Sequence, residues 1–251
     1  MELFMSLLSW ACIVFTVGMF STGLTDLKKM RATKSTDNIQ FLPFLTTCLN
    51  NLGWLYYGIL KRDQTVILVN VIGAALQTLY ITVFIHYTKQ KKPFLSQTLL
   101  AGAVLAGGWF YFSTFLPEGE TRLNQLGLTC SAITVSMYLS PLTDLVNIVR
   151  SGNVQCLSFP LTVATFFTST SWVLYGHQVS DLYMVVPNMP GILTNSERAA
   201  AVGKAGTEVL IPGPCVCEGG CFLSSKRRPP RTSRLNIRVF TVGKAKRHGW
   251  F

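Results

Sequence analysis

Charged residues are scarce in this chain of 251 residues: 13% are Asp, Glu, Lys or Arg, whereas 49% are hydrophobic. They are also clustered. Between Arg62 and Lys89, the only acidic or imidazole side chains are Asp63 and His86. Long runs almost free of charge are typical of bilayer spans, so the composition argues against a soluble fold.

Residue patterns of enzymes are also missing. The sequence contains no Ser/His/Asp set, no metal-ligand spacing and no glycine-rich phosphate loop, and its three histidines are isolated. Cys215, Cys217 and Cys221 lack a clear fourth zinc ligand. We therefore predict that the protein is not an enzyme and needs no metal and no cofactor.

The apolar runs predict six membrane spans of roughly 20 residues each and an incomplete seventh. The predicted spans are Leu3–Leu24, Phe41–Leu60, Thr65–Tyr87, Phe94–Leu116, Leu123–Val149 and Leu157–Gly176, with a seventh that begins at Leu182. The N-terminus lacks a basic stretch and a cleavage site, so we expect the first span to be retained.

Basic residues in the connections predict the orientation. Eight lie on one side of the membrane, after the first, third and fifth spans, and three lie on the other side. Because cytoplasmic loops are enriched in Lys and Arg, we expect the N-terminus outside and, if the seventh span inserts, the C-terminus in the cytoplasm.

The excess of positive charge belongs mostly to the C-terminal tail. Of the 22 Lys and Arg, eleven follow Thr194, against three of the 11 acidic residues. This tail is rich in Gly, Pro and Ser and has no periodicity, so we expect residues 195–251 to be disordered. We interpret the charge as a local property of a solvated tail or of a tail that touches anionic lipid, and predict no nucleic-acid partner.

An internal repeat is the most informative feature of the sequence. At an offset of 118 residues, several short motifs recur. The matches are Leu24–Leu27 with Leu142–Leu145, Trp54 with Trp172, Tyr57-Gly58 with Tyr175-Gly176, Asp63 with Asp181, Asn70 with Asn188 and Gly73 with Gly191. A single duplication explains all of them.

Two copies of three spans in the same orientation need one extra helix between them. We therefore predict an all-α membrane protein of two parallel three-helix bundles joined by a linker helix, with a truncated seventh helix. The predicted parts are residues 1–87, a linker 88–122, the second repeat 123–194 and the tail 195–251. In transporters with such parallel repeats, substrate binds near the midplane between the repeats.

Asn70 and Asn188 occupy equivalent positions in the third span of each repeat. An amide in hydrocarbon needs a polar partner or a water-filled cavity, and its donors and acceptor suit vicinal sugar hydroxyls. Bonding to a neighbouring helix is the alternative. Because the two are related by the repeat, we predict that they bind substrate.

Trp54 and Trp172 begin the repeated W-x-x-Y-G pattern. They could stack on a pyranose ring or anchor in the interfacial aromatic belt. Tyr56, Tyr57 and Tyr175 are candidates for a gate at the outer mouth, with belt anchoring as the alternative.

Helix-breaking residues are candidate hinges. Pro43, Pro141 and Pro160 lie within or at the starts of spans, and Gly23 occupies the place in the first repeat that Pro141 has in the second. Proline loosens the helix ladder, although it is also simply common in membrane helices.

Asp26 and Asp144 sit beside basic loops at the cytoplasmic span ends, as surface ion pairs or as an inner gate. No Asp, Glu, Lys or Arg lies mid-span, and proton-coupled carriers generally need such a group. Facilitated diffusion is therefore favoured over symport.

At these residues the chain resembles the SWEET sugar transporters, and in particular animal members of that family. Matching stretches are Gly18–Ser21, Gln40–Thr47, Asn50–Trp54, Gly73–Tyr80 and Ser136–Leu142, within coverage from about Leu3 to Thr194. The resemblance implies a 3+1+3 arrangement and bidirectional uniport of glucose-like mono- or disaccharides in Golgi and plasma membranes. It also implies that the Asn and Trp pairs face the sugar and that prolines act as hinges; many members have Pro where Gly23 stands.

The resemblance ends in the seventh span. Leu182–Leu193 would extend roughly 18 Å, against a hydrocarbon core of about 30 Å. The leading hypothesis is thus a sugar uniporter, and the alternative is a non-transporting variant that assembles with or regulates full-length copies. A homo-oligomer is left open.

Overall fold

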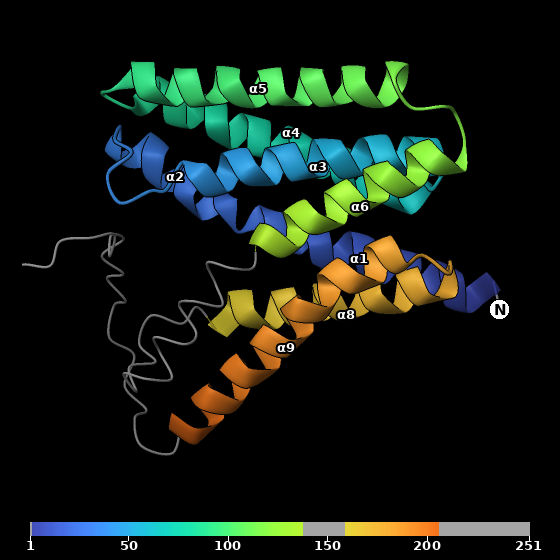
Figure 1. Cartoon of the computed structure of the whole chain (residues 1–251). Helices are drawn as coiled ribbons and strands as arrows, with labels where there is room; N and C mark the ends of the chain where they lie inside the picture. The colour runs from blue at the N-terminus through green and yellow to red at the C-terminus, as the bar shows by residue number, and fades with distance from the viewer. Residues whose placement is uncertain (1, 138–158, 206–251) are drawn as a thin grey trace, which may run out of the picture. The chain divides into compact units, whose positions relative to one another are not determined.

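A computed structural model describes residues 2–137 and 159–205, and within these residues the regular secondary structure is all α-helical (Figure 1). This agrees with the predicted all-α class. The helices are α1 (Glu2–Ser21), α2 (Gly23–Thr33), α3 (Leu42–Lys61), α4 (Gln64–Tyr87), α5 (Lys91–Thr114), α6 (Glu120–Met137), α8 (Phe159–Gln178) and α9 (Leu182–Ala205). Pro141, Asp144 and the tail from residue 206 onward lie outside the described residues.

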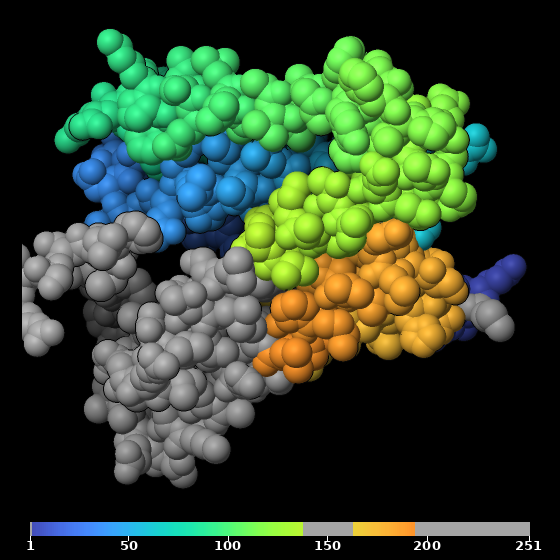
Figure 2. Space-filling view, in the orientation of Figure 1, coloured from blue at the N-terminus to red at the C-terminus, as the bar shows by residue number. Residues whose placement is uncertain are grey.

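The helices pack as two similar triplets joined by a linker. In the first triplet α4 packs against α1 and α2 on one side and α3 on the other, and in the second α9 packs between α6 and α8. Across the triplets, α1 packs on α8 and α3 packs on α6, while α5 packs on α3 and α4. Figure 2 shows α6 and α9 side by side. The first helix of each repeat therefore packs on the second helix of the other.

Both repeats turn from their second into their third helix in the same way. Arg62 and Ser180 adopt left-handed backbone angles, and the amides of Asp63 and Asp181 donate to the carbonyls of Gly58 and Gly176. Such a cap ends a helix and satisfies its last carbonyls. The aspartate then caps the next helix, since the Asp63 carboxylate accepts from the Val66 amide at 3.1 Å. These turns lie at one end of the bundle, which we call the Asp63/Asp181 end.

The first span is divided near its predicted end. Helix α1 ends at Ser21, and α2 begins at Gly23. Around this break the hydroxyls of Ser21, Thr22 and Thr25 donate to backbone carbonyls three or four residues earlier. Hydroxyls that bond back to the ladder favour helix bending. The chain then continues to the opposite end of the bundle, which we call the Asp26 end.

Helix α9 is longer than the sequence indicated. We expected helical structure to fail near Thr194, but α9 runs to Ala205, so the predicted disorder from residue 195 is wrong for residues 195–205. Alanine has the highest helix propensity, and the run Ala199–Ala201 supports this extension. The apolar part is still only Leu182–Leu193. The helix continues, but its apolar length stays short.

Pro187 interrupts the backbone ladder inside α9. Proline has no amide hydrogen, so it cannot donate to the carbonyl of Tyr183, four residues earlier. The hydroxyl of Ser131, on α6, donates to that carbonyl at 2.7 Å. A neighbouring helix thus satisfies the acceptor that the proline leaves free.

Three of the described helical segments are long and apolar enough to cross a membrane by length and composition: α1 with α2, α4 and α5. We predicted more full spans. Helix α3 falls short because it carries Thr46, Thr47, Asn50 and Asn51 within its apolar sequence. Helix α5, by contrast, exposes large apolar side chains such as Leu99. Polar residues are therefore concentrated on helices inside the bundle.

Candidate functional site

A cavity of about 280 Å³ lies between the two repeats. Helices α1, α3 and α4 contribute to one wall, and α6, α8 and α9 contribute to the other. Small-molecule sites usually occupy about 300–1,000 Å³, so this cavity is at the small end of that range. It has room for one small ligand.

The lining residues come largely in repeat-related pairs. Most members of one wall have their partner, 118 residues away, in the other wall. The pairs are Thr16 and Thr134, Met19 and Met137, Thr47 and Thr165, Asn50 and Thr168, Asn51 and Ser169, Trp54 and Trp172, Val66 and Met184, and Asn70 and Asn188. All four predicted substrate-binding residues are among them. The structure therefore brings Trp54, Asn70, Trp172 and Asn188 to one cavity.

The two tryptophans are fixed by equivalent hydrogen bonds across the repeats. The indole nitrogen of Trp54 donates to the Thr134 hydroxyl at 3.0 Å, and that of Trp172 donates to the Thr16 hydroxyl at 2.9 Å. Trp54 is 9% exposed. This burial does not fit an interfacial belt, the alternative considered for Trp54, because a belt residue would face lipid headgroups.

The two asparagines are held within their own helices. The side-chain nitrogens of Asn70 and Asn188 each donate at 2.8 Å to the carbonyl four residues earlier, those of Val66 and Met184. These two hydrogen bonds therefore lie within one helix and do not join neighbouring helices, which was the alternative role considered for both asparagines. A carboxamide has two donors and an acceptor, so each retains capacity for a further partner in the cavity.

Sequence reasoning missed two further amides in the lining, Asn50 and Asn51. The Asn50 side-chain oxygen accepts from the Thr134 hydroxyl at 2.9 Å. Asn51 is buried against Gly73, where any added Cβ would come within 2.5 Å of its nitrogen. Both asparagines stand within one turn of Trp54, and this proximity was the available signal.

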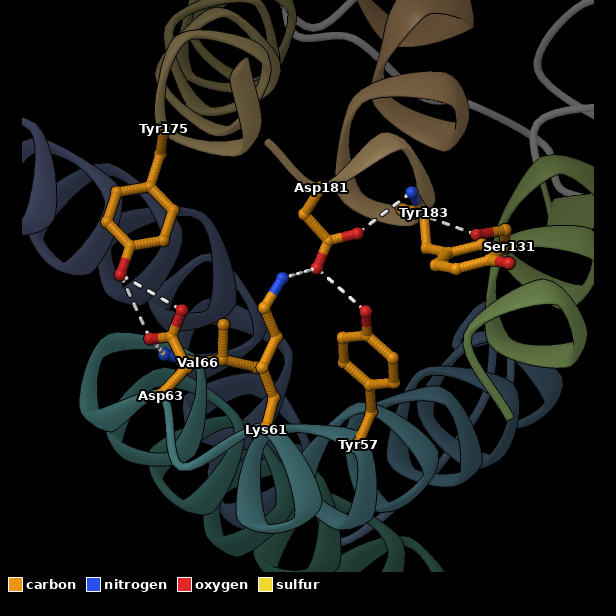
Figure 3. A network of polar contacts seen from close by, with 8 residues as sticks. All are labelled: Tyr57, Lys61, Asp63, Val66, Ser131, Tyr175, Asp181 and Tyr183. Carbon is orange, nitrogen blue, oxygen red and sulfur yellow. Dashed lines mark hydrogen bonds and ion pairs between the residues drawn. The ribbon is translucent and has the colours of Figure 1, made fainter. Parts of the chain in front are cut away.

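Beyond the cavity, a network of tyrosines and aspartates joins the repeats at the Asp63/Asp181 end (Figure 3). The Tyr57 hydroxyl donates to the Asp181 carboxylate at 2.7 Å, and the Tyr175 hydroxyl donates to the Asp63 carboxylate at 3.0 Å. Each tyrosine follows its tryptophan by one helical turn toward this end. Tyr57 and Tyr175 are 1% and 5% exposed, so the described residues leave little open space there.

One member of the network has no equivalent in the other repeat. The Lys61 ammonium forms an ion pair with the Asp181 carboxylate (Figure 3), and the repeat-related position of Lys61 is Val179. Asp181, at 4% exposed, therefore accepts from Lys61, from the Tyr57 hydroxyl and from the Tyr183 amide. From the sequence, Asp63 and Asp181 were recognised only as matches between the repeats. Their recurrence after each Tyr-Gly pair could have indicated a role in joining the repeats.

The other predicted gate and hinge residues are dispersed. Tyr56 is half-buried against the apolar cluster around Tyr57 and Tyr175, and the cavity lining does not include it. Pro43 is the second residue of α3, where its missing amide hydrogen breaks no intrahelical bond. Pro160 lies in α8, next to residues that the structure does not describe. The hinge role of both prolines stays a prediction.

A second cavity, of about 660 Å³, lies toward the Asp26 end and contains three other predicted residues in its lining: Gly23, Asp26 and Pro43. Met19, Phe20 and Thr47 line both cavities. The two spaces therefore adjoin. Gly23 packs tightly against α4, since a Cβ there would lie 2.5 Å from the Tyr80 ring.

The described lining of the central cavity contains amides, hydroxyls, indoles and apolar groups, and no Asp, Glu, Lys or Arg. Such a surface can offer several hydrogen bonds and two aromatic faces to a neutral polar ligand. No group of three or more potential metal ligands occurs in the part of the chain that the structure describes.

Comparison with known proteins gives a consistent result. The family described as "Sugar efflux transporter for intercellular exchange" matches residues 6–92 and 124–200. The chain is 67% identical to Sugar transporter SWEET1 of Danio rerio over 195 residues, which are 78% of this chain and 89% of that protein. With Sugar transporter SWEET1 of Homo sapiens the identity is 56%, covering 77% of this chain and 87% of that protein.

A solved structure is also similar. A eukaryotic SWEET transporter determined at 3.7 Å resolution superposes with a TM-score of 0.75 at 27% identity, over 81% of this chain and 97% of that one. This confirms the predicted fold class of two three-helix repeats joined by a linker.

Proposed function

Since the chain belongs to the SWEET family of sugar transporters, we propose that it carries glucose-like sugars across a membrane in both directions by facilitated diffusion. The family is one of transporters and not of enzymes. The single observation that carries the proposal is the uncharged cavity between the repeats, lined by the paired tryptophans and asparagines. A neutral polyol suits this lining, whereas a proton-coupled carrier would need a titratable group there.

In the proposed cycle, the sugar ring stacks on the indoles of Trp54 and Trp172, and its hydroxyls bond to the amides of Asn70 and Asn188. The repeats then rock about the bound sugar and open the cavity to one end at a time. The tyrosine–aspartate network would break when the Asp63/Asp181 end opens. Gly23, Pro43, Pro141 and Pro160 are the proposed hinges, and Tyr56, Asp26 and Asp144 remain gate candidates.

We further propose that the Asp63/Asp181 end faces the outside or the lumen and the Asp26 end the cytoplasm. The basic residues within and directly after α2, and those that follow α4, support this orientation. The same rule puts the N-terminus outside. The resemblance to animal members of the family supports residence in Golgi and plasma membranes.

Uptake of labelled glucose into proteoliposomes tests the proposal. Wild-type protein should equilibrate the sugar without an ion gradient, and Asn70→Ala or Trp172→Ala should reduce the initial rate at least tenfold, the effect of losing about 1.4 kcal/mol of binding at the site. Asn124→Ala and Trp109→Ala are matched controls because both wild-type side chains are exposed. If all four variants transport equally, the proposed site is wrong.

A second candidate function is favoured by the short apolar part of α9. Leu182–Leu193 covers only part of a bilayer core, so the chain could assemble with full-length copies without transporting sugar itself. Replacing the sequence after Thr194 by an apolar completion should then raise uptake from background to a measurable rate. Equal uptake above background with and without this completion would remove the second candidate.

A further inference from the structure

The second cavity has a polar lining that, apart from Thr47, is separate from that of the central site. Its polar residues come from α2 and the residue before it, from α3 and from α4, and they include a buried amide. They are Thr22, Thr25, Asp26, Thr47 and Gln77, which we call the Gln77 vestibule. Gln77 follows Asn70 by seven residues on α4, so the two lie on the same helix face about 10 Å apart along the axis.

Gln77 carries the buried polar atom of this group that has no hydrogen-bond partner among the described residues. Its side chain is 6% exposed, and its buried oxygen accepts no hydrogen bond within the described part of the chain. Buried polar atoms are almost always hydrogen-bonded, to protein, to water or to a ligand. Because Gln77 lines the vestibule, a rotation of its side chain would present this oxygen to a donor in that space.

The vestibule is rich in acceptors. The hydroxyls of Thr22 and Thr25 already donate to the carbonyls of Met19 and Thr22, at 2.7 Å each, so only their lone pairs remain. The Asp26 carboxylate is an acceptor when ionised. With the Gln77 oxygen, these groups match a ligand that offers several O–H donors, whereas an anion would find no cation in the described lining.

We propose that the Gln77 vestibule is a second sugar-binding position, where the Gln77 oxygen and the Asp26 carboxylate accept hydrogen bonds from sugar hydroxyls. The proposal rests on the function proposed above. A sugar leaving Asn70 toward the Asp26 end would meet Gln77 two helical turns later, and would exchange one set of hydrogen bonds for another before full hydration. The vestibule would thus determine how tightly sugar is held at that end.

The test compares the two directions of transport in vesicles of known orientation. In Gln77→Leu, the half-saturating glucose concentration should rise about fivefold for entry from the Asp26 end, the effect of one lost neutral hydrogen bond. For entry from the other end it should change less. The maximal rate from the Asp26 end should rise in proportion, because a passive carrier must keep the ratio of rate to half-saturation equal in both directions.

Gln64→Leu is the matched control, since Gln64 is an exposed glutamine at the opposite end of the same helix; neither constant should change. Asp26→Asn provides a second variant and should produce the same one-sided shift. Unchanged constants in both vestibule variants, or equal shifts from both ends, would overturn the vestibule while wild-type transport still supports the proposed function. A Gln77-dependent requirement for Na⁺ would overturn it too, in favour of a cation.

Discussion

The two repeats of this protein are joined by reciprocal hydrogen bonds, in which each repeat donates to the other from equivalent residues. Tyr57 of the first repeat reaches Asp181 of the second, and Tyr175 of the second reaches Asp63 of the first. The tryptophans follow the same rule with Thr134 and Thr16. A duplicated sequence thus completes its own interface, because each copy supplies both a donor and an acceptor at equivalent positions.

The repeats differ at the same interface. The first has Lys61 where the second has Val179, and the second has Pro187 where the first has Val69. The lysine adds a third partner to Asp181, and the proline removes a backbone donor that Ser131 replaces. The bonds that both repeats share therefore hold the Asp63/Asp181 end together. The residues that differ make the contacts around Asp181 stronger than those around Asp63.

The largest expected effect comes from removing the two aspartates one at a time, which compares the strength of their contacts. Asp181→Ala should destabilise the protein by about 3 kcal/mol, because it leaves Lys61 and Tyr57 without their buried acceptor. Asp63→Ala should cost about 2 kcal/mol, since it loses a helix cap and one tyrosine bond. Thermal unfolding in detergent measures both losses of stability. Equal decreases in the unfolding temperature would mean that Lys61 contributes nothing to the stability of the Asp63/Asp181 end.

A second prediction tests the symmetry where the sequence repeats most closely. A Cβ at Gly58 would lie 2.9 Å from a Val66 methyl, and one at Gly176 would lie 3.0 Å from the Met184 Cβ. Gly58→Ala and Gly176→Ala should each cost about 1–2 kcal/mol, because overpacking strains the contact with the next helix. Gly102→Ala is the control, as nothing lies within 4 Å of its added Cβ, and it should be neutral. A large effect in only one repeat would contradict the symmetry.

The smallest expected effect concerns Pro187. Ser131→Ala should cost about 1 kcal/mol, because the Tyr183 carbonyl loses its only donor among the described bonds. Valine is the residue that the first repeat has at this position. In a Pro187→Val background, the restored amide hydrogen can donate to the Tyr183 carbonyl. The same substitution should then cost little. A double-mutant cycle measured by thermal unfolding gives the coupling, and additive effects would show that the hydroxyl does not replace the proline's missing bond.

Periodic features of the sequence predicted much of this structure. The apolar runs indicated the helices, and the 118-residue offset indicated which residues are equivalent, so Asn70, Asn188, Trp54 and Trp172 could be placed at one interface. The hydrogen-bond partners could not be predicted, because whether Trp54 reaches Thr134 or another residue depends on how α3 packs on α6. The break at Thr22 and the extension of α9 to Ala205 depend on local backbone bonding and propensity that hydropathy does not register.

The packing of α1 on α8 also has a consequence for biosynthesis. The bond from Trp172 to Thr16 joins positions 156 residues apart, and synthesis at about 5–20 residues per second separates their emergence by about 8–30 seconds. Throughout that interval the newly inserted α1 lacks the helix that will cover it. During that time α4, which also packs on α1 in the finished structure, can cover part of it.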